Sequence, residues 1–164
     1  GAPNMDHYLK GTEGGVRNAQ AGARVALELK KSGFVPDQML GHNGWGEISY
    51  LKDVSPSTPL LGFFEFFYRI AGADVGFDPE LSTSFDDGPR IRTKNLGNLL
   101  GLDTCDMGQC PTQWQKSVFP QRYQSMLHLV HVGVDTHSDK PDTLARLTLA
   151  NSELEMATVD RVVN

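Results

Sequence analysis

The residues best suited to chemistry lie in the run "LGHNGWGEISYLKDV", which spans positions 40–54 and follows a short apolar segment. An imidazole such as that of His42 can donate or accept a proton near neutral pH. Trp45 offers a flat ring and Glu47 a carboxylate in the same run. Short loops after parallel strands are where open α/β sheets bind ligands. The run therefore predicts a ligand site.

A second chemical signal is Glu65, which stands inside the apolar stretch "GFFEFFY". Burying an unpaired carboxylate costs several kcal/mol, so this side chain must either have a partner or face a ligand site. The candidate partners are Arg69, four residues later, or another basic residue. Both alternatives stay open on the sequence alone.

The pattern that surrounds these residues alternates helices with strands, which is typical of βαβ units and a parallel sheet. Gly33 follows Lys30 and Lys31 as a helix-ending residue, and Thr112 is a candidate N-cap. The carboxyl ends of all strands would meet at one edge of such a sheet. The expected elements are helices over 16–31, 46–54, 90–102 and 113–118, strands over 38–41, 60–67, 107–110 and 126–132, and a long loop over 71–89.

Composition narrows the class of protein. The chain has 164 residues with 39% hydrophobic content, which fits one domain with one core. Its net charge of -5 and scattered basic residues disfavour a nucleic-acid partner. The sequence shows neither a stretch of about 20 apolar residues nor the layout of a signal peptide, so the expected compartment is the cytoplasm. Cys105 and Cys110 lack a second ligand pair for zinc and are expected to be reduced thiols.

Five motifs, "GHNGWGE", "FFEFFYR", "GADVGFDPE", "CPTQWQKSVFP" and "HVGVDT", occur in this order. Through them the chain, from position 16 onward, resembles the N-terminal domain of a bacterial family 4 glycosyltransferase. The resemblance implies an α/β, Rossmann-like parallel sheet with flanking helices, as part of the N-terminal half of a GT-B fold. It also implies retaining hexosyl transfer from a nucleotide-sugar donor to an acceptor hydroxyl, with no metal or other cofactor.

The same resemblance implies a domain division. Residues 1–15 are expected to be a loose leader or a remnant of cloning, residues 16–136 the acceptor-side domain, and residues 137–164 a linker towards a donor domain. Alone, the chain is expected to be inactive. The family's first strand has no counterpart here, so the strand ending at His42 should be an open edge, which favours self-association.

Roles for single residues follow from the resemblance, and each has a plainer alternative. His42 and Glu65 are the expected catalytic residues. The expected substrate-binding residues are Gly44, Trp45, Glu47, Tyr68, Thr112, His131 and Gly133. The alternatives are a turn histidine at 42, core filling by the tryptophan, a helix-dipole contact for Glu47 and an N-cap for Thr112.

Other functions stay open at this point. His42, Glu65 and His131 together would suit a metal, although no spacing marks them as a ligand set. A non-catalytic carbohydrate-binding or regulatory module would use the same fold. A purely structural role for the motifs is a further alternative. Some relatives act on lipid-linked acceptors, which makes the inner face of the membrane an alternative location, but no basic amphipathic stretch marks this chain for an anionic surface.

Overall fold

A computed structural model describes residues 7–73, 75–78, 80–81, 84–141, 147–149 and 152–154. The chain divides into two compact units, Gly1–His131 and Val132–Asn164. The boundary therefore lies five residues before the predicted one at position 136. In the second unit, β5 (Leu147–Leu149) and β6 (Ser152–Leu154) form an antiparallel pair. Of the predicted linker, residues 142–146, 150–151 and 155–164 lie outside the described residues.

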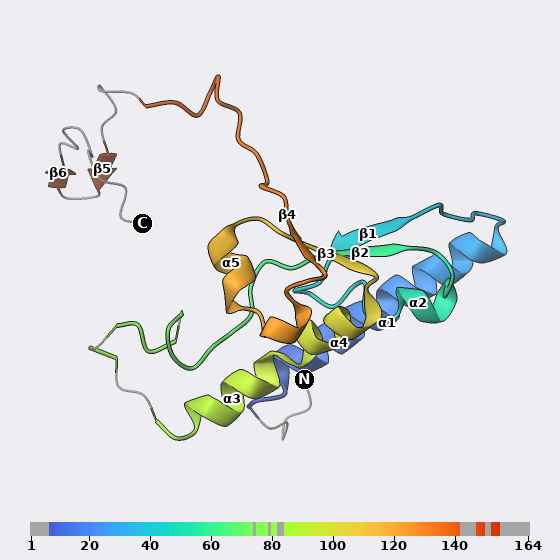
Figure 1. Cartoon of the computed structure of the whole chain (residues 1–164), viewed down its shortest axis with the longest axis horizontal. Coiled ribbons are helices and arrows are strands. Elements are labelled where there is room, and N and C mark those ends of the chain that lie inside the picture. Colours follow the sequence, from blue (N-terminus) through green and yellow to red (C-terminus); the bar gives the residue numbers. More distant parts are fainter. Residues whose placement is uncertain are drawn as a thin grey trace. The chain divides into compact units, whose positions relative to one another are not determined.

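The first unit contains a four-stranded, all-parallel sheet in the order β1-β2-β3-β4 (Figure 1). The predicted α/β parallel sheet is confirmed. The strands are β1 (Met39–His42), β2 (Leu60–Phe63), β3 (Met107–Cys110) and β4 (Leu127–Leu129). In the register, His42 pairs with Phe63, so the last residues of the first two strands lie next to each other.

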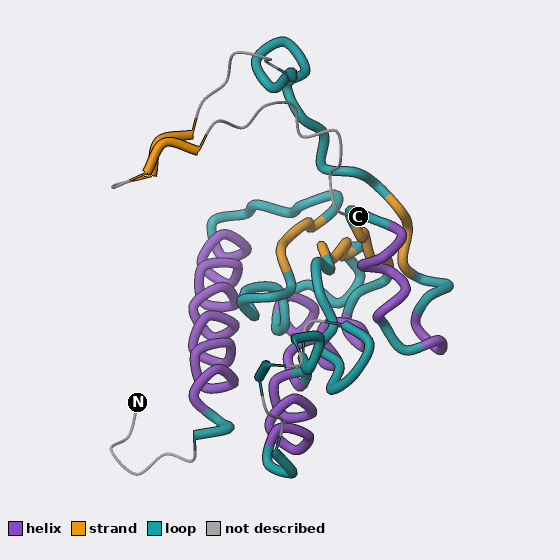
Figure 2. The backbone as a smooth tube through the Cα atoms, turned by 90° about the vertical axis from the view of Figure 1, so that its left-hand side faces the viewer, coloured by secondary structure: helices purple, strands orange, loops and turns teal. Residues whose placement is uncertain are grey.

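Helices connect and flank these strands (Figures 1 and 2). The elements are α1 (Lys10–Lys31), α2 (Leu51–Val54), α3 (Asp87–Lys94), α4 (Leu96–Thr104), α5 (Gln113–Val118) and the short 3-10 helix η1 (Gln121–Tyr123). The predicted helix over 46–54 is wrong in its first part, because 46–50 form turns. The predicted helix over 90–102 begins earlier and is divided at Asn95.

Helix α1 begins at Lys10, so the prediction of a loose leader is wrong for residues 10–15. Of the glycines there, Gly15 packs against the loop after β1, since a Cβ added at Gly46 would lie 2.4 Å from its carbonyl oxygen, and this packing offsets the low helix propensity of glycine. A Cβ added at Gly22 would lie 2.5 Å from the carbonyl oxygen of Glu47, so the helix backbone touches the loop after β1. The Asn18 side chain also donates to the carbonyl of Trp45 at 2.8 Å. The helix therefore supports the 45–47 loop.

The end of α1 is the predicted one. Gly33 has a φ of +89°, and its N–H donates to the carbonyl of Lys30 at 3.1 Å. The N–H of Phe34 reaches back to the carbonyl of Leu29 at 3.0 Å. This pair of bonds is the Schellman motif, which needs a residue with positive φ.

The core lies between the sheet and the helices packed on it. Its largest fully buried apolar side chains are Phe64, Phe119, Leu60 and Leu127. The rings of Phe64 and Phe119 meet edge to face with centroids 6.0 Å apart. Fully burying such aromatic and aliphatic side chains contributes about 1.5–3 kcal/mol each, so this cluster holds the sheet on which the site is built.

Cys105 and Cys110 are free and buried, as the sequence predicts. Burial raises the pKa of Cys105 to about 12 and that of Cys110 to about 11. Because the thiolate is the nucleophile, we expect iodoacetamide to leave both thiols unlabelled at pH 8 in the native protein. In guanidinium chloride both should be labelled, as mass spectrometry would show. Rapid native labelling would contradict this burial.

Candidate functional site

His42 and Glu65 come together at the carboxyl ends of β1 and β2. The Nε2 atom of His42 lies 3.3 Å from Oε2 of Glu65. The side chains are 33% and 58% exposed, so the pair is open to a ligand. The register of the sheet explains this contact. His42 pairs with Phe63, and Glu65, two residues after Phe63, lies on the same side of the chain as Phe63.

The His42 ring is fixed by its own loop. The backbone N–H of Gly44 donates to Nδ1 at 2.9 Å, and the ring lies 5.3 Å from that of Phe63. Since Nδ1 accepts this hydrogen bond, the neutral ring carries its proton on Nε2 and donates it to Glu65. An N–H donor and a carboxylate acceptor thus lie side by side. Together they complement a hydroxyl group, which both accepts and donates.

Gly44 has no room for a side chain. An added Cβ would lie 2.6 Å from Cε1 of His42 and 3.1 Å from its Nδ1. We therefore expect Gly44→Ala to turn the imidazole and to break the hydrogen bond that selects the Nε2–H tautomer. Long-range proton–nitrogen NMR spectra would show a mixture of tautomers, with a stability loss of about 1 kcal/mol. Gly14→Ala, at an open position of α1, is the control. An unchanged His42 spectrum in Gly44→Ala would contradict this account.

A buried set of three asparagines ties together the two loops of the site: Asn43 in the loop after β1, Asn95 just before α4 and Asn98 within α4. Asn43 donates to Oδ1 of Asn98 at 3.1 Å. Asn98 in turn donates to the carbonyl of Phe66 at 2.9 Å. Asn95 receives the N–H of Tyr68 at 3.0 Å and donates to the carbonyl of the same residue at 2.8 Å. We call this set the asparagine brace.

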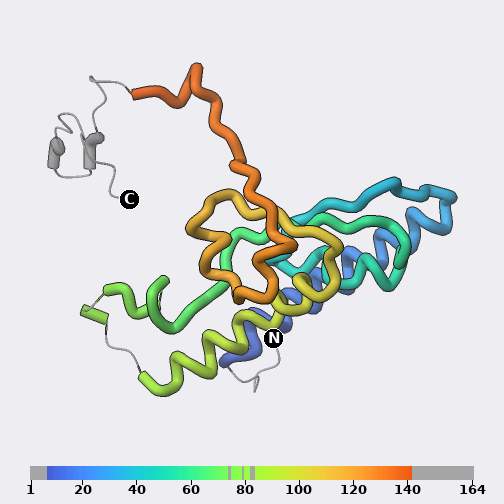
Figure 3. Tube along the Cα trace, in the orientation of Figure 1, coloured from blue at the N-terminus to red at the C-terminus, as the bar shows by residue number. Residues whose placement is uncertain are grey.

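The asparagine brace explains why β2 is shorter than predicted. The expected strand over 60–67 ends at Phe63, and the backbone of 66–68 is then bonded by side-chain amides instead of a neighbouring strand. Figure 3 shows this part of the chain, in green, leaving the sheet after β2. Buried backbone groups must find partners, and here α4 supplies them.

The innermost member of the asparagine brace is tightly enclosed. Asn43 is 2% exposed, and its Oδ1 is buried without a hydrogen-bond partner among the described residues. A Cβ added at Gly101 would lie 1.8 Å from that oxygen. Only a glycine at this position of α4 lets the Asn43 amide reach Asn98.

Trp45 and Glu47 both lie on the surface of the loop. Trp45 is 67% exposed, so the core-filling alternative is wrong. Glu47 is also exposed, and it stands four residues before α2 begins at Leu51, so the helix-dipole alternative is wrong. Gly46 has a φ of +88°, which confirms the expected need for glycine at that turn. Substrate roles for these residues stay predictions.

Thr112 is the N-cap of α5, which confirms the alternative to a substrate-binding role. Its Oγ1 accepts from the N–H of Gln115 at 3.1 Å and donates to the side chain of Gln115 at 2.7 Å. The first of these bonds is an N-cap bond, which satisfies one free N–H group in the first turn of α5. The hydroxyl is thus already engaged within the protein.

The remaining predicted residues lie in different surroundings. Tyr68 is half-buried beside the asparagine brace, and the Nζ of Lys94 lies 3.6 Å from the centroid of its ring. His131 is exposed and lies two residues beyond β4. Gly133, with a φ of +71°, belongs to the second unit, which is described by itself.

Of the alternative partners for Glu65, Arg69 is wrong, and the carboxylate lies against His42 instead. Arg69 does not pair with it; its Nε donates to the carbonyl of Val118 at 2.6 Å, at the end of α5. In the described part of the chain, no group of three His, Cys, Asp or Glu side chains is placed to hold a metal ion. The described helices include none long and apolar enough to cross a bilayer.

Sequence reasoning missed the asparagine brace altogether. Asn95 and Asn98 stand three residues apart in "KNLGNLLG", within a helical apolar pattern. Residues at that spacing share one face of a helix. Polar amides on the buried face of a helix must have partners, and this was the available signal.

Comparison with known proteins supplies the family. The sequence model described as "Glycosyl transferase family 4 group" matches residues 1–138, which include β1 to β4 and all the residues of the candidate site described above. No curated protein compared with the chain matches it.

Proposed function

This chain belongs to the glycosyl transferase family 4 group, and from that membership we propose that it helps to transfer a sugar from a nucleotide-sugar donor to an acceptor hydroxyl. The observation that carries the proposal is the 3.3 Å approach of His42 Nε2 to the carboxylate of Glu65 at the open ends of β1 and β2. A sugar hydroxyl that takes the place of this direct contact would accept from the imidazole N–H and donate to the carboxylate, once the two side chains have moved apart to admit it.

The proposed reaction proceeds with retention. The acceptor oxygen forms a bond to the anomeric carbon, the bond from that carbon to the departing phosphate breaks, and the acceptor proton passes to the phosphate. His42 and Glu65 would contribute by orienting hydroxyl groups and by stabilising developing charge. The Gly44 N–H holds the His42 ring, and the asparagine brace anchors the backbone just after Glu65, so a hydroxyl could be admitted by moving the exposed Glu65 side chain alone.

The proposal includes a metal-independent reaction in the cytoplasm, with a longer natural product as the active enzyme. This part of the proposal rests on the family and on the sequence motifs through which the chain resembles it. Adding EDTA to the natural protein should leave its transfer rate unchanged. A loss of activity that Mg²⁺ or Mn²⁺ restores would contradict this part of the proposal.

Binding of nucleotide sugars tests the proposed function directly. We would record ligand-observed NMR for a panel of UDP-, GDP- and ADP-sugars, with this chain and with the natural full-length product in parallel. Binding and transfer by the longer protein would support a glycosyltransferase and identify its donor. If neither protein binds a nucleotide sugar but either binds free oligosaccharides, the function is instead that of a carbohydrate-binding module.

We also propose that the isolated chain associates with itself through β1. This strand is at the edge of the described sheet and pairs only with β2 there, and Leu40 on it is exposed. Unpaired edges favour pairing with another chain. Light scattering at increasing concentration should show dimers or larger species. A monomer throughout would contradict the proposal.

A further inference from the structure

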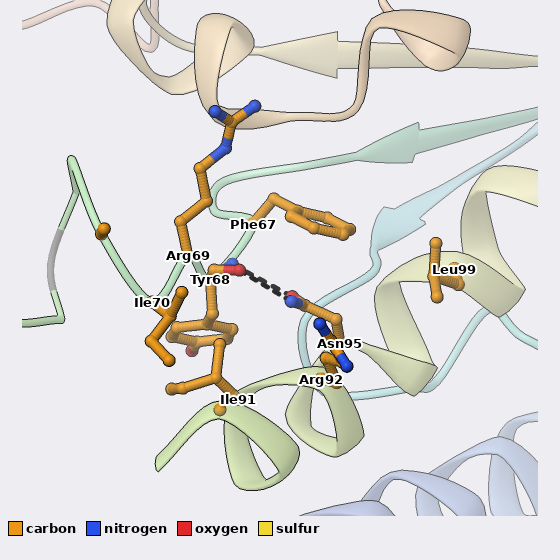
Figure 4. A pocket seen from close by; sticks show the side chains of 10 residues that line it. Phe67, Tyr68, Arg69, Ile70, Ile91, Arg92, Asn95 and Leu99 are labelled. Carbon is orange, nitrogen blue, oxygen red and sulfur yellow. Dashed lines mark hydrogen bonds between the residues drawn. The ribbon is translucent and has the colours of Figure 1, made fainter. Parts of the chain in front are cut away.

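A pocket lies between the segment that follows Glu65 in the chain and helix α3 (Figure 4). Its volume is about 350 Å³. Tyr68, Ile70 and Ala71 line it from the segment after β2, and Ile91 and Arg92 line it from α3. The lining of the pocket thus begins shortly after Glu65 in the sequence.

The floor of this pocket is apolar and largely fixed. The Tyr68 ring lies between Ile70 and Ile91 in Figure 4. Ile91 is buried, whereas Ile70 is half exposed at the mouth of the pocket. The α3 backbone at Gly88 comes close to Ile70, since an added Cβ would lie 3.2 Å from its Cδ1. An apolar group of a ligand would therefore be removed from water here.

Helix α3 brings two cations to the pocket, Arg92, which lines it, and Lys94, next to the lining Tyr68. A third cation, Arg69, also lines the pocket, but its guanidinium is bonded to backbone carbonyls at the end of α5. The Nζ of Lys94 lies over the Tyr68 ring at 3.6 Å from its centroid, and Arg92 lines the pocket. No ion pair between described residues engages either of them. Arg90 of the same helix, in contrast, is paired with Asp87 at 2.9 Å. Two cations beside an apolar floor complement a ligand that has an anionic group next to an apolar one.

The asparagine brace joins this pocket to the His42–Glu65 pair. Asn95 lines the pocket and holds both backbone groups of Tyr68. It also accepts from Asn98 at 3.3 Å, and Asn98 is bonded to Asn43, the neighbour of His42 in the chain. A ligand in the pocket would thus be placed at a fixed position relative to the two candidate catalytic side chains.

We propose that this pocket binds the non-reacting part of the acceptor, and that the acceptor carries an apolar group beside a phosphate or carboxylate. The inference rests on the proposed function, since only a transferase has an acceptor. It deepens that function by naming the chemical class of the substrate. Binding energy from such a remote group serves to orient the reacting hydroxyl.

The test measures binding of small soluble probes to the chain by proton–nitrogen NMR titration. Hexyl phosphate and phenyl phosphate represent the aliphatic and aromatic forms of the ligand; inorganic phosphate and hexyltrimethylammonium are the controls. We expect both organic phosphates to shift the amides of Tyr68 and Ile91 and to bind at least tenfold more tightly than either control. Equal binding of inorganic phosphate and hexyl phosphate would overturn the proposal.

Variants locate the binding. The double change Arg92→Gln with Lys94→Gln should weaken hexyl phosphate binding at least tenfold. Arg122→Gln is the matched control, because Arg122 also lies over a tyrosine ring, that of Tyr123 at 4.7 Å, but away from the pocket lining. It should bind as the unchanged chain does. An equal loss in both variants would overturn the proposal. The three substituted side chains are all exposed, so equal melting temperatures are expected.

Two further comparisons separate the possible outcomes. Vesicles containing phosphatidic acid distinguish a lipid-linked acceptor, which predicts binding to vesicles and to hexyl phosphate, from a soluble acceptor, which predicts binding to hexyl phosphate alone. None of these probes contains a nucleotide sugar. If this chain does not bind the probes but the natural protein transfers sugar, the pocket proposal is refuted and the proposed function stands. If this chain binds the probes but the natural protein transfers no sugar, the proposed function is refuted.

Discussion

Replacing His42 with alanine should lower the rate of sugar transfer by about 100- to 1,000-fold in the natural protein that contains this chain, the range seen when one preorganised hydrogen-bond donor is removed. The change removes the Nε2–H group that lies 3.3 Å from Glu65. Glu65→Gln keeps the shape but loses the charge, and hydrogen bonds to charged groups contribute about 1.5–3 kcal/mol, so transfer should fall about 10- to 100-fold.

The double variant tests whether the two side chains act as one unit. If they bind the same hydroxyl, the combined loss should be smaller than the product of the two single losses. His128→Ala is the control, since this exposed histidine lies on β4 and is not part of the candidate site. His42→Ala also removes the hydrogen bond from the Gly44 N–H, so it should lose about 1 kcal/mol of stability, and transfer is therefore compared well below the melting temperature of every variant. Full activity of His42→Ala would remove His42 from the mechanism.

Gly101→Ala should destabilise the fold by about 3 kcal/mol. The new methyl group would have to lie where Oδ1 of Asn43 now is, at 1.8 Å. Overpacking a core costs about 1–3 kcal/mol, and moving the amide away from Asn98 leaves buried polar groups without partners at about 1–3 kcal/mol. Denaturant unfolding would measure the loss as a lower midpoint with an unchanged slope.

The matched control stands in the same helix. Gly97 is exposed, and a Cβ added there meets nothing within 4 Å. Gly97→Ala should stabilise the protein by up to about 1 kcal/mol, because alanine loses less conformational entropy in a helix than glycine does. The same substitution at two positions four residues apart should thus have opposite signs. Destabilisation of similar size at both would refute the role assigned to Asn43.

Local signals predicted much of the fold. The strand Met107–Cys110 has the expected bounds, Gly33 ends α1, and Thr112 caps α5. Each of these depends on residues close together in the sequence. The end of β2 does not, because "LLGFFEFFY" continues in a strand-like pattern after Phe63. Its pairing stops where the side-chain amides of Asn95 and Asn98 bind the backbone of Tyr68 and Phe66. These pairs are 27 and 32 positions apart in the sequence.

The residue types of the site and their place at one edge of the sheet were predictable, but their direct contacts were not. His42 and Glu65 stood out because an imidazole and a carboxylate in apolar surroundings need an explanation. Their contact with each other was missed, and Arg69 was considered for Glu65 because it is near in the sequence. Asn43 and Asn98 hold the two loops but carry no charge. They do not interrupt the spacing of apolar residues that predicts the helix and the strand, so the sequence pattern did not single them out.

The asparagine brace also fixes an order of events during synthesis on the ribosome. Asn43 and Asn98 are 55 positions apart, and Asn98 and Phe66 are 32 apart. His42, Glu65 and the sheet partners β1 and β2 are therefore translated before the helix that anchors their loops. A nascent chain that ends before α4 carries both chemical groups without the contacts that orient them. Because contacts between distant positions form late, binding competence should arise only after α4 has emerged and docked.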